Sequence, residues 1–480
     1  MKKNLTFYSI LFIAFFFLQR GSGLITKLIL ANTVTPYEYG LITLVALSLP
    51  TFFQILMYLN FSSILSHATE GRNYFGFAIL SSFIIGIIIS IFLFIYQNNF
   101  FEFLNIPTDN RWLFYWALII SMFSLGIITD FYGLLTGLRL YSLPGLISAI
   151  PSVIRLGFVL LLLILNKLSF ETIILFFAIS NTIPLIYLIF SRNRQQYLPY
   201  IKSFNIPTKK MLAFGTALFI VGTYSTIGML LIKIVVSHKL GIIWQGYFDI
   251  SMTLVSIAIF LLGTMNFISV PEATNSDRTK IHKNSELSDV SRALFSQMFI
   301  LLIIMYFYSK FIVGILFPDK YIYAAQYCYI LVIGYIFLYV QNYLANLNIS
   351  FAKTPKEYLI QAALPLLLLP FFFILTEKSI NFLESLNYGN GFVGAYLSYC
   401  IMIIILTLFT IICSKDLKYL STFIYKSEKL IFSFALTFSL ILLTSLPALI
   451  GIPVSFIIFN CFLFYFGYLN KTLITEIFNR

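Results

Sequence analysis

The sequence predicts an all-α polytopic membrane protein with about 14 transmembrane helices. Two features of the composition carry this prediction: 60% of the 480 residues are apolar, and only 10% are charged. A soluble domain is about 25% charged, so this chain has too few polar side chains to cover a water-exposed surface. The same composition, which includes 53 Phe, excludes a disordered chain and a soluble globular enzyme.

Fourteen apolar segments are long enough to cross a bilayer, which takes about 20 residues per helix. The predicted spans are 8–31, 39–61, 74–96, 112–137, 145–165, 172–190, 212–237, 246–270, 293–317, 322–345, 358–375, 392–413, 430–449 and 453–470. Arg20 interrupts the first segment and no A-x-A site follows it, so we expect a retained span rather than a signal peptide. Only the turn from Ile450 to Pro453 separates the last two spans, and it is expected to divide them.

The distribution of Lys and Arg predicts the orientation. With the N-terminus in the cytoplasm, the inside segments hold 21 basic residues and the outside segments hold 5, which follows the positive-inside rule. Acidic residues divide into 9 inside, 7 outside and 2 within spans, so the net charge of +13 separates into +12 inside, −2 outside and +3 within the membrane. We therefore expect a multi-pass protein of the cytoplasmic membrane with both termini cytoplasmic. This basicity reflects topology, so no nucleic-acid partner is expected.

An internal duplication is visible at an offset of 206 residues. Lys27 ends the sequence Leu-Ile-Thr-Lys in the first span, and Lys233 ends Leu-Leu-Ile-Lys in the seventh. Thirteen residues after each lysine stands a glycine, Gly40 or Gly246. A repeat of six helices keeps both copies in the same orientation, a known plan for transporters. The predicted divisions are an N-terminal six-helix lobe at 1–205, a second six-helix lobe at 206–413, and two additional helices with a cytoplasmic tail at 414–480.

Seven ionisable residues lie within the predicted spans, where each is costly unless it is paired or hydrated. They are Arg20, Lys27, Asp130, Arg155, Lys233, Asp249 and Lys310. Lys233 could pair with Asp249, and Asp130 with Arg155, since each pair lies on consecutive helices; for both pairs, a structural role and a ligand-facing role stay open. Lys310 is expected to reach toward the outer membrane surface. Arg20 and Lys27 have no acidic residue nearby in the sequence.

These charges predict an anionic substrate. Five bases face two acids, so three positive charges cannot be cancelled by pairing within the membrane. Such a surplus requires a hydrated cavity or an anionic ligand, and Arg suits phosphate oxygens in particular. We predict that Arg20, Lys27, Arg155 and Lys233 bind the substrate. Asp130, Asp249 and Lys310 are predicted as ion-pair or ion-coupling residues.

The sequence lacks the motifs of the common enzyme classes. It has no G-x-x-x-x-G-K-[ST] loop for ATP and no H-E-x-x-H motif, and its three His are far apart. The longest predicted external segments, 97–111 and 376–391, are too short for the catalytic loops that a membrane glycosyltransferase or polysaccharide polymerase usually carries. We expect a transporter rather than an enzyme, with no catalytic residue, metal site or cofactor.

Several stretches resemble the polysaccharide transporter family, which includes the Wzx-type O-antigen flippases. They are Gln19-Arg20-Gly21-Ser22-Gly23 through Pro36-Tyr37-Glu38-Tyr39-Gly40, Gly314 to Tyr321 with Ala324-Ala325, Asn346 to Lys353, and Tyr388 to Ala395. The family belongs to the multidrug/oligosaccharidyl-lipid/polysaccharide exporter (MOP) superfamily. The resemblance extends over residues 1–413 and departs from the family pattern at Pro318, where relatives commonly have Gly.

The resemblance implies a MATE-like fold, in which two lobes enclose a cationic cavity, with two helices added at the C-terminus. It also implies a flippase that carries an undecaprenyl-pyrophosphate-linked oligosaccharide across the membrane by alternating access, for O-antigen or another surface polysaccharide. The expected partners are this lipid-linked oligosaccharide, membrane lipids and other polysaccharide assembly proteins. Coupling to H⁺ or Na⁺ stays open. The alternatives are a cation-coupled multidrug exporter of the same superfamily and, less favoured, a membrane glycosyltransferase or polysaccharide polymerase.

Overall fold

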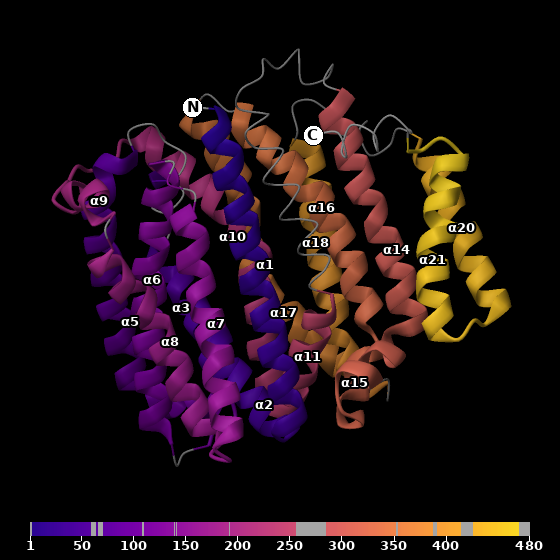
Figure 1. Cartoon of the computed structure of the whole chain (residues 1–480), viewed down its shortest axis with the longest axis horizontal. Helices are drawn as coiled ribbons and strands as arrows, with labels where there is room; N and C mark the ends of the chain where they lie inside the picture. The colour runs from indigo at the N-terminus through magenta and orange to yellow at the C-terminus, as the bar shows by residue number, and fades with distance from the viewer. Residues whose placement is uncertain are drawn as a thin grey trace. The chain divides into compact units, whose positions relative to one another are not determined.

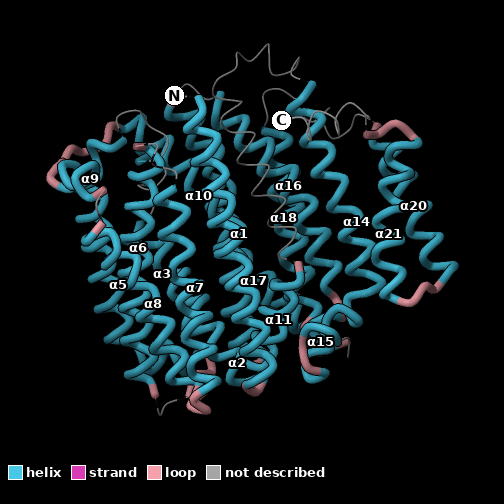
Figure 2. Tube along the Cα trace, viewed as in Figure 1, coloured by secondary structure: helices cyan, strands magenta, loops and turns pink. Residues whose placement is uncertain are grey.

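The computed structural model is built of helices, as the composition predicts. The structure describes residues 2–58, 64–65, 71–107, 110–138, 140, 142–191, 193–255, 285–351, 354–386, 391–413 and 426–469. Figure 2 shows helices joined by loops, and no strand occurs in these ranges. The chain divides into two compact units, Met1–Asp249 and Ile250–Arg480.

Unit 1 contains the helices from α1 to the first part of α11 (Figure 1). They are α1 (Lys2–Thr33), α2 (Pro36–Ile42), the π-helical turn η1 (Thr43–Ser48), α3 (Leu49–Tyr58), the 3₁₀ turn η2 (Gly71–Tyr74), α5 (Phe75–Phe103), α6 (Arg111–Gly137), α7 (Ser142–Ile164), α8 (Phe170–Phe190), α9 (Arg194–Ile201), α10 (Lys209–Leu240) and the first part of α11 (Ile242–Leu254). α6 packs against α3, α5 and α8, and α7 packs along both α8 and α1.

Unit 2 contains the end of α11 and the remaining helices. They are α14 (Ser285–Leu316), the 3₁₀ turn η3 (Asp319–Tyr321), α15 (Ile322–Ala325), α16 (Cys328–Phe351), α17 (Pro355–Ser385), α18 (Val393–Cys413), α20 (Ser427–Thr444) and α21 (Ala448–Tyr465). α18 packs between α16 and α17, while α20 and α21 pair with each other and contact α14. Gly451 permits the close approach of α21, because a Cβ at this position would lie 2.0 Å from the hydroxyl of Tyr308 on α14.

Twelve helices in the described residues are long and apolar enough to cross a membrane. Each corresponds to one of the predicted spans, from 39–61 onward, with ends shifted by up to ten residues. Of the other two, span 8–31 lies within α1, and the part of span 246–270 beyond Val255 lies outside the described residues. The polytopic all-helical class is therefore confirmed.

The predicted division of the last two spans was wrong by several residues. The helix break falls at Ser445, which adopts a left-handed conformation with φ 45°, and not at Ile450–Pro453. Pro447 follows two residues later and disfavours helical backbone in the residue before it. Pro453 instead lies inside α21, where packing with α20 and α14 outweighs the loss of one backbone hydrogen bond.

α10 is tied to the end of α5 within unit 1. Asn105 donates from Nδ2 to the carbonyl of Ser237 at 2.7 Å, and Ser237 donates to the carbonyl of Leu104 at 2.7 Å. The ring of His238 stacks on Phe103 with centroids 4.0 Å apart. These contacts explain why α10 belongs to unit 1 by packing. They do not test the lobes at 1–205 and 206–413, which rest on the sequence repeat and stay a prediction.

The two repeat-related glycines face each other where α2 meets α11. A Cβ on Gly40 would lie 2.2 Å from the carbonyl oxygen of Ile242, and a Cβ on Gly246 would lie 3.1 Å from that of Pro36. The contact is reciprocal, because both partners are shifted by 206 residues (242 − 36 and 246 − 40). Reciprocity of this kind is expected when a two-fold axis relates two segments. It supports the duplication in this part of the chain.

This crossing predicts a strict requirement for glycine at position 40. Gly40→Ala would place a methyl group against backbone and force α2 and α11 apart, so we expect a loss of about 1–3 kcal/mol in stability. Gly222→Ala is the matched control, since a Cβ there meets nothing within 4 Å and Ala favours helix by up to about 1 kcal/mol. Thermal unfolding in detergent measures both. An equal melting temperature for the two variants would contradict the close approach.

Candidate functional site

The start of α2 is set by its own sequence. Thr35 accepts a hydrogen bond from the Glu38 amide, and Glu38 accepts one from the Thr35 amide at 2.8 Å, with Pro36 at the first helical position. This capping box fixes where the helix begins. It therefore fixes the positions of Tyr39, which contacts an acidic residue of α11, and of Gly40, which lies in the helix crossing.

Asp249 on α11 binds three side chains. Its Oδ2 accepts hydrogen bonds from Lys27 Nζ at 2.7 Å and from the hydroxyl of Tyr39 at 3.1 Å. Its Oδ1 accepts from Lys233 Nζ at 2.5 Å, and Lys233 also donates to Ser48 Oγ at 3.1 Å. We call these five residues the lysine–aspartate centre. They come from α1, α2, η1, α10 and α11.

The lysine–aspartate centre carries one net positive charge, since two ammonium groups share one carboxylate. The side chains of Asp249, Lys233 and Lys27 are 3%, 12% and 24% exposed, respectively. Burial of two cations against one anion is unfavourable, because the attraction to one carboxylate can offset the desolvation free energy of one ammonium group at best. Lys27 is the most accessible of the three, so it is the member that a ligand could reach first.

Ser48 reaches this centre from a distorted part of the helix. The backbone from Thr43 to Ser48 follows π-helical geometry, and the Leu49 amide bonds to the Leu44 carbonyl. Pro50 follows and cannot donate a backbone hydrogen bond. Such π turns are uncommon and occur frequently at functional sites.

The two lysines of the repeat share one acidic partner. The Lys233–Asp249 pair is confirmed. Lys27 has no acidic residue nearby in the sequence, as stated above; its partner is Asp249, which lies 222 residues away. The repeat carried the missing signal: if Lys27 and Lys233 are equivalent positions near a two-fold axis, one carboxylate can reach both.

A second cationic group lies between α7 and α8. Arg155 donates from Nε to Ser180 Oγ at 3.0 Å and from Nη2 to Asn181 Oδ1. Its guanidinium carbon lies 5.3 Å from the centroid of the Phe177 ring. We call these four residues the Arg155 centre. All the partners are uncharged, so this centre keeps a full positive charge.

The predicted pair between Asp130 and Arg155 was wrong. Asp130 on α6 is fully buried and accepts a hydrogen bond from Ser82 of α5 at 2.7 Å, while its Oδ1 has no hydrogen-bond partner among the described residues. The two residues are on consecutive helices, but their side chains serve different interfaces. Asp130 lies between α5 and α6, whereas Arg155 lies between α7 and α8.

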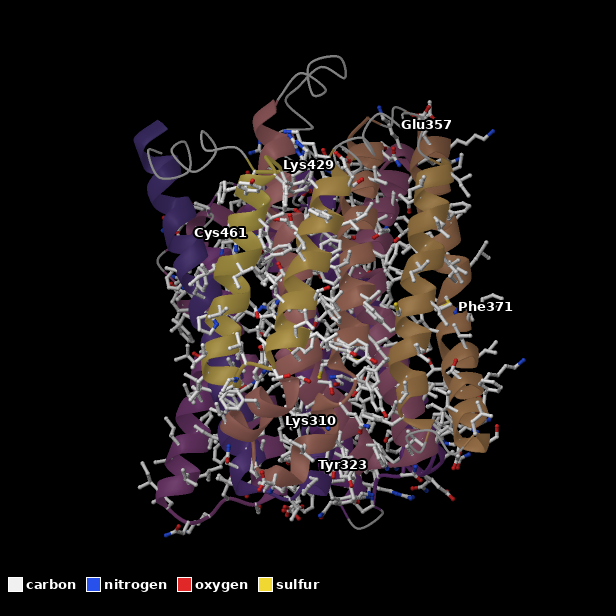
Figure 3. All side chains as sticks on the ribbon, turned by 90° about the vertical axis from the view of Figure 1, so that its right-hand side faces the viewer. Lys310, Tyr323, Glu357, Phe371, Lys429 and Cys461 are labelled. Atoms are coloured by element: carbon white, nitrogen blue, oxygen red, sulfur yellow. The ribbon has the colours of Figure 1, made fainter. Side chains whose placement is uncertain are left out.

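The remaining two predicted site residues are exposed. Arg20 lies on α1, seven residues before Lys27, with an exposed side chain. Lys310 lies on α14 in unit 2 and is also exposed; Figure 3 places it near Tyr323, toward the α15 end of α14. Exposure is what a lysine that reaches for the membrane surface requires. The functional roles of all seven charged residues stay predictions.

Comparison with known proteins gives the fold. No family model matches the sequence, and no curated protein matches it. Among solved structures, the lipid II flippase MurJ in an inward closed conformation has a TM-score of 0.66 at 14% identity, over 94% of this chain and 98% of MurJ. A MATE transporter in complex with MaD3S has a TM-score of 0.55 at 11% identity, over 86% of this chain and 95% of the MATE.

The chain has the MurJ/MATE fold. A MOP superfamily transporter from Pyrococcus furiosus, described as having a binding pocket of reverse polarity, shares this fold at a TM-score of 0.55 and 10% identity, over 88% of this chain and 96% of that one. TM-scores of 0.55–0.66 establish a common fold, and identities of 10–14% leave the substrate open. The MATE-like architecture predicted from the sequence is confirmed.

The lysine–aspartate centre predicts a strong dependence on Asp249. Asp249→Asn leaves two ammonium groups without their shared carboxylate, and breaking a buried ion pair in this way typically costs about 3–5 kcal/mol. We expect a lower melting temperature in detergent, and expect Lys233→Met to recover part of the loss in the double variant. Lys310→Met, at an exposed position, should leave the melting temperature unchanged. A wild-type melting temperature for Asp249→Asn would contradict the shared-carboxylate arrangement.

Proposed function

We propose that the protein is a flippase that moves a lipid-linked anionic oligosaccharide across the cytoplasmic membrane by alternating access. One observation carries this proposal. Within the predicted spans of unit 1, four cations face two acids, and the cation of the Arg155 centre has only uncharged hydrogen-bond partners among the described residues. A surplus of cations in a medium of low dielectric constant needs an anion, and a substrate headgroup supplies one.

The headgroup that fits is a pyrophosphate. Arg recognises phosphate oxygens by paired hydrogen bonds, and Lys contributes point charge. The two lysines stand at repeat-related positions, which suits an anion with two phosphates. Undecaprenyl-pyrophosphate-linked oligosaccharide combines this headgroup with a prenyl tail that would stay in the lipid. The resemblance of residues 1–413 to polysaccharide transporters favours the same substrate, with O-antigen or another surface polysaccharide as the product.

The structural comparison supports the class. MurJ is named as a flippase of lipid II, and this chain shares its fold over nearly its full length. In the proposed cycle, Arg20, Lys27, Arg155 and Lys233 bind the headgroup while the protein alternates between inward-open and outward-open states. Asp249 releases the lysines to the substrate anion and takes them back after release.

A cation-coupled multidrug exporter is the second candidate, favoured by the MATE structures of the same fold. The charges of unit 1 disfavour a multidrug exporter, because a site for organic cations should be rich in acidic residues. Here Asp249 forms ion pairs with two lysines. Asp130 is the remaining acidic residue in the predicted spans of that unit. Resistance to cationic drugs in a sensitised host would favour this candidate.

Reconstituted transport tests the proposal. Proteoliposomes would hold labelled undecaprenyl-pyrophosphate oligosaccharide, and a membrane-impermeant reagent would report its appearance in the opposite leaflet. We expect the wild-type protein to translocate it and Arg155→Gln to lower the rate about tenfold or more, since a hydrogen bond to a charged group contributes about 1.5–3 kcal/mol.

Lys378→Gln is the matched control, because it removes one positive charge from an exposed position of α17 in unit 2, outside the predicted spans. It should transport at the wild-type rate. Absence of translocation by the wild-type protein would reject the flippase assignment. Equal rates for Arg155→Gln and Lys378→Gln would reject the role of Arg155 in it.

A further inference from the structure

The guanidinium of Arg155 is held along one edge by consecutive residues of α8. Nε donates to Ser180 and Nη2 donates to Asn181, so the engaged groups are the two that make up the side edge of the guanidinium plane. Both partners are fully buried, as is Phe177, which contacts the guanidinium face. Arg155 lies near the middle of α7, a candidate membrane span, so its orientation is set away from the ends of that span.

These two hydrogen bonds do not involve all the N–H donors of the Arg155 guanidinium. A guanidinium has five N–H groups in a fixed plane, and these two hydrogen bonds use two of them. The three that remain are both protons of Nη1 and the second proton of Nη2. One proton of Nη1 and the second proton of Nη2 form the terminal edge, which has the geometry for two oxygens of a phosphate. Within the described residues, Arg155 has no acidic partner to occupy this edge.

The identity of residue 181 argues for a role beyond stability. Arg155 only donates, so the amide must present Oδ1 to it, and the buried Nδ2 is left without a hydrogen-bond partner among the described residues. A buried unsatisfied donor is unfavourable. An aspartate has the same shape, would accept the same hydrogen bond, would remove the unsatisfied donor and would neutralise a buried cation. Asn181 lacks these advantages for stability, but it leaves the positive charge of Arg155 in place.

We propose that Ser180 and Asn181 are positioning residues that hold the guanidinium by its side edge and keep its terminal edge charged and available for a phosphate of the headgroup. This inference rests on the proposed function for the identity of the substrate. The oxyanion site itself does not, because a free anion can report on it.

The isosteric substitution Asn181→Asp separates positioning from stability. A purely structural role predicts that this variant behaves as wild type or better. The present proposal predicts an unchanged or higher melting temperature, together with an apparent KM for the lipid-linked substrate raised about tenfold or more, close to that of Arg155→Gln. Thr182→Val is the matched control, since Thr182 donates only to the Ile179 carbonyl. It should leave KM unchanged.

A readout independent of transport uses inorganic pyrophosphate and thermal shift of the purified full-length protein. Pyrophosphate should raise the melting temperature of the wild-type protein. Arg155→Gln should reduce this increase, and Asn181→Asp should reduce it by the same amount. Ser180→Asp adds the same charge on the Nε side and carries the test if Asn181→Asp does not fold. If these variants lose the stabilisation by pyrophosphate but the wild-type protein translocates no lipid-linked substrate, the oxyanion site is supported and the flippase assignment is rejected.

Two results would overturn the inference. One is an Asn181→Asp protein that keeps the wild-type KM and the wild-type pyrophosphate response. The other is a pyrophosphate response that is absent from the wild type, or that Arg155→Gln leaves intact.

Discussion

The sharing of one carboxylate by two intramembrane lysines is the interaction on which the rest of the structure depends. Asp249 binds Lys27 of α1 and Lys233 of α10, and therefore joins the start of the chain to its middle at a largely buried point. One anion cannot balance two cations, so the centre that stabilises unit 1 also holds a net charge that an anionic ligand can use. Under the proposed function, the same three side chains contribute to stability and attract the substrate.

This ionic centre forms because the backbones beside it can approach closely. The reciprocal contacts of Gly40 with Ile242 and of Gly246 with Pro36 bring α2 against α11, and the capping box at Thr35 fixes where α2 begins. The stretch Pro36-Tyr37-Glu38-Tyr39-Gly40, which resembles the opening of polysaccharide transporters, thus has a physical explanation. It supplies a helix start, a hydroxyl for Asp249 and a position without a side chain.

Hydropathy was sufficient to predict the helical class and twelve of the spans, because apolar length is a property of the sequence alone. The partners of the charged side chains were harder to predict. Lys27 pairs with a residue 222 positions away, and Asp130 and Arg155 turn toward different helices although they lie on consecutive ones. The neutral residues Ser82, Ser180 and Asn181 left no signal in composition, since any of them could equally be a packing residue. Their hydrogen bonds to the charged side chains become visible only when the helix faces are known.

The central claim is that intramembrane cations recognise the anionic headgroup of a lipid-linked glycan. Comparison of two substrates in the same proteoliposomes tests it most directly: an undecaprenyl-pyrophosphate-linked oligosaccharide and the same oligosaccharide joined to the prenyl chain through an uncharged link. Translocation of the charged substrate, with little or none of the neutral one, is the predicted result. Equal translocation of both would show that the cations do not select the headgroup and would contradict the account.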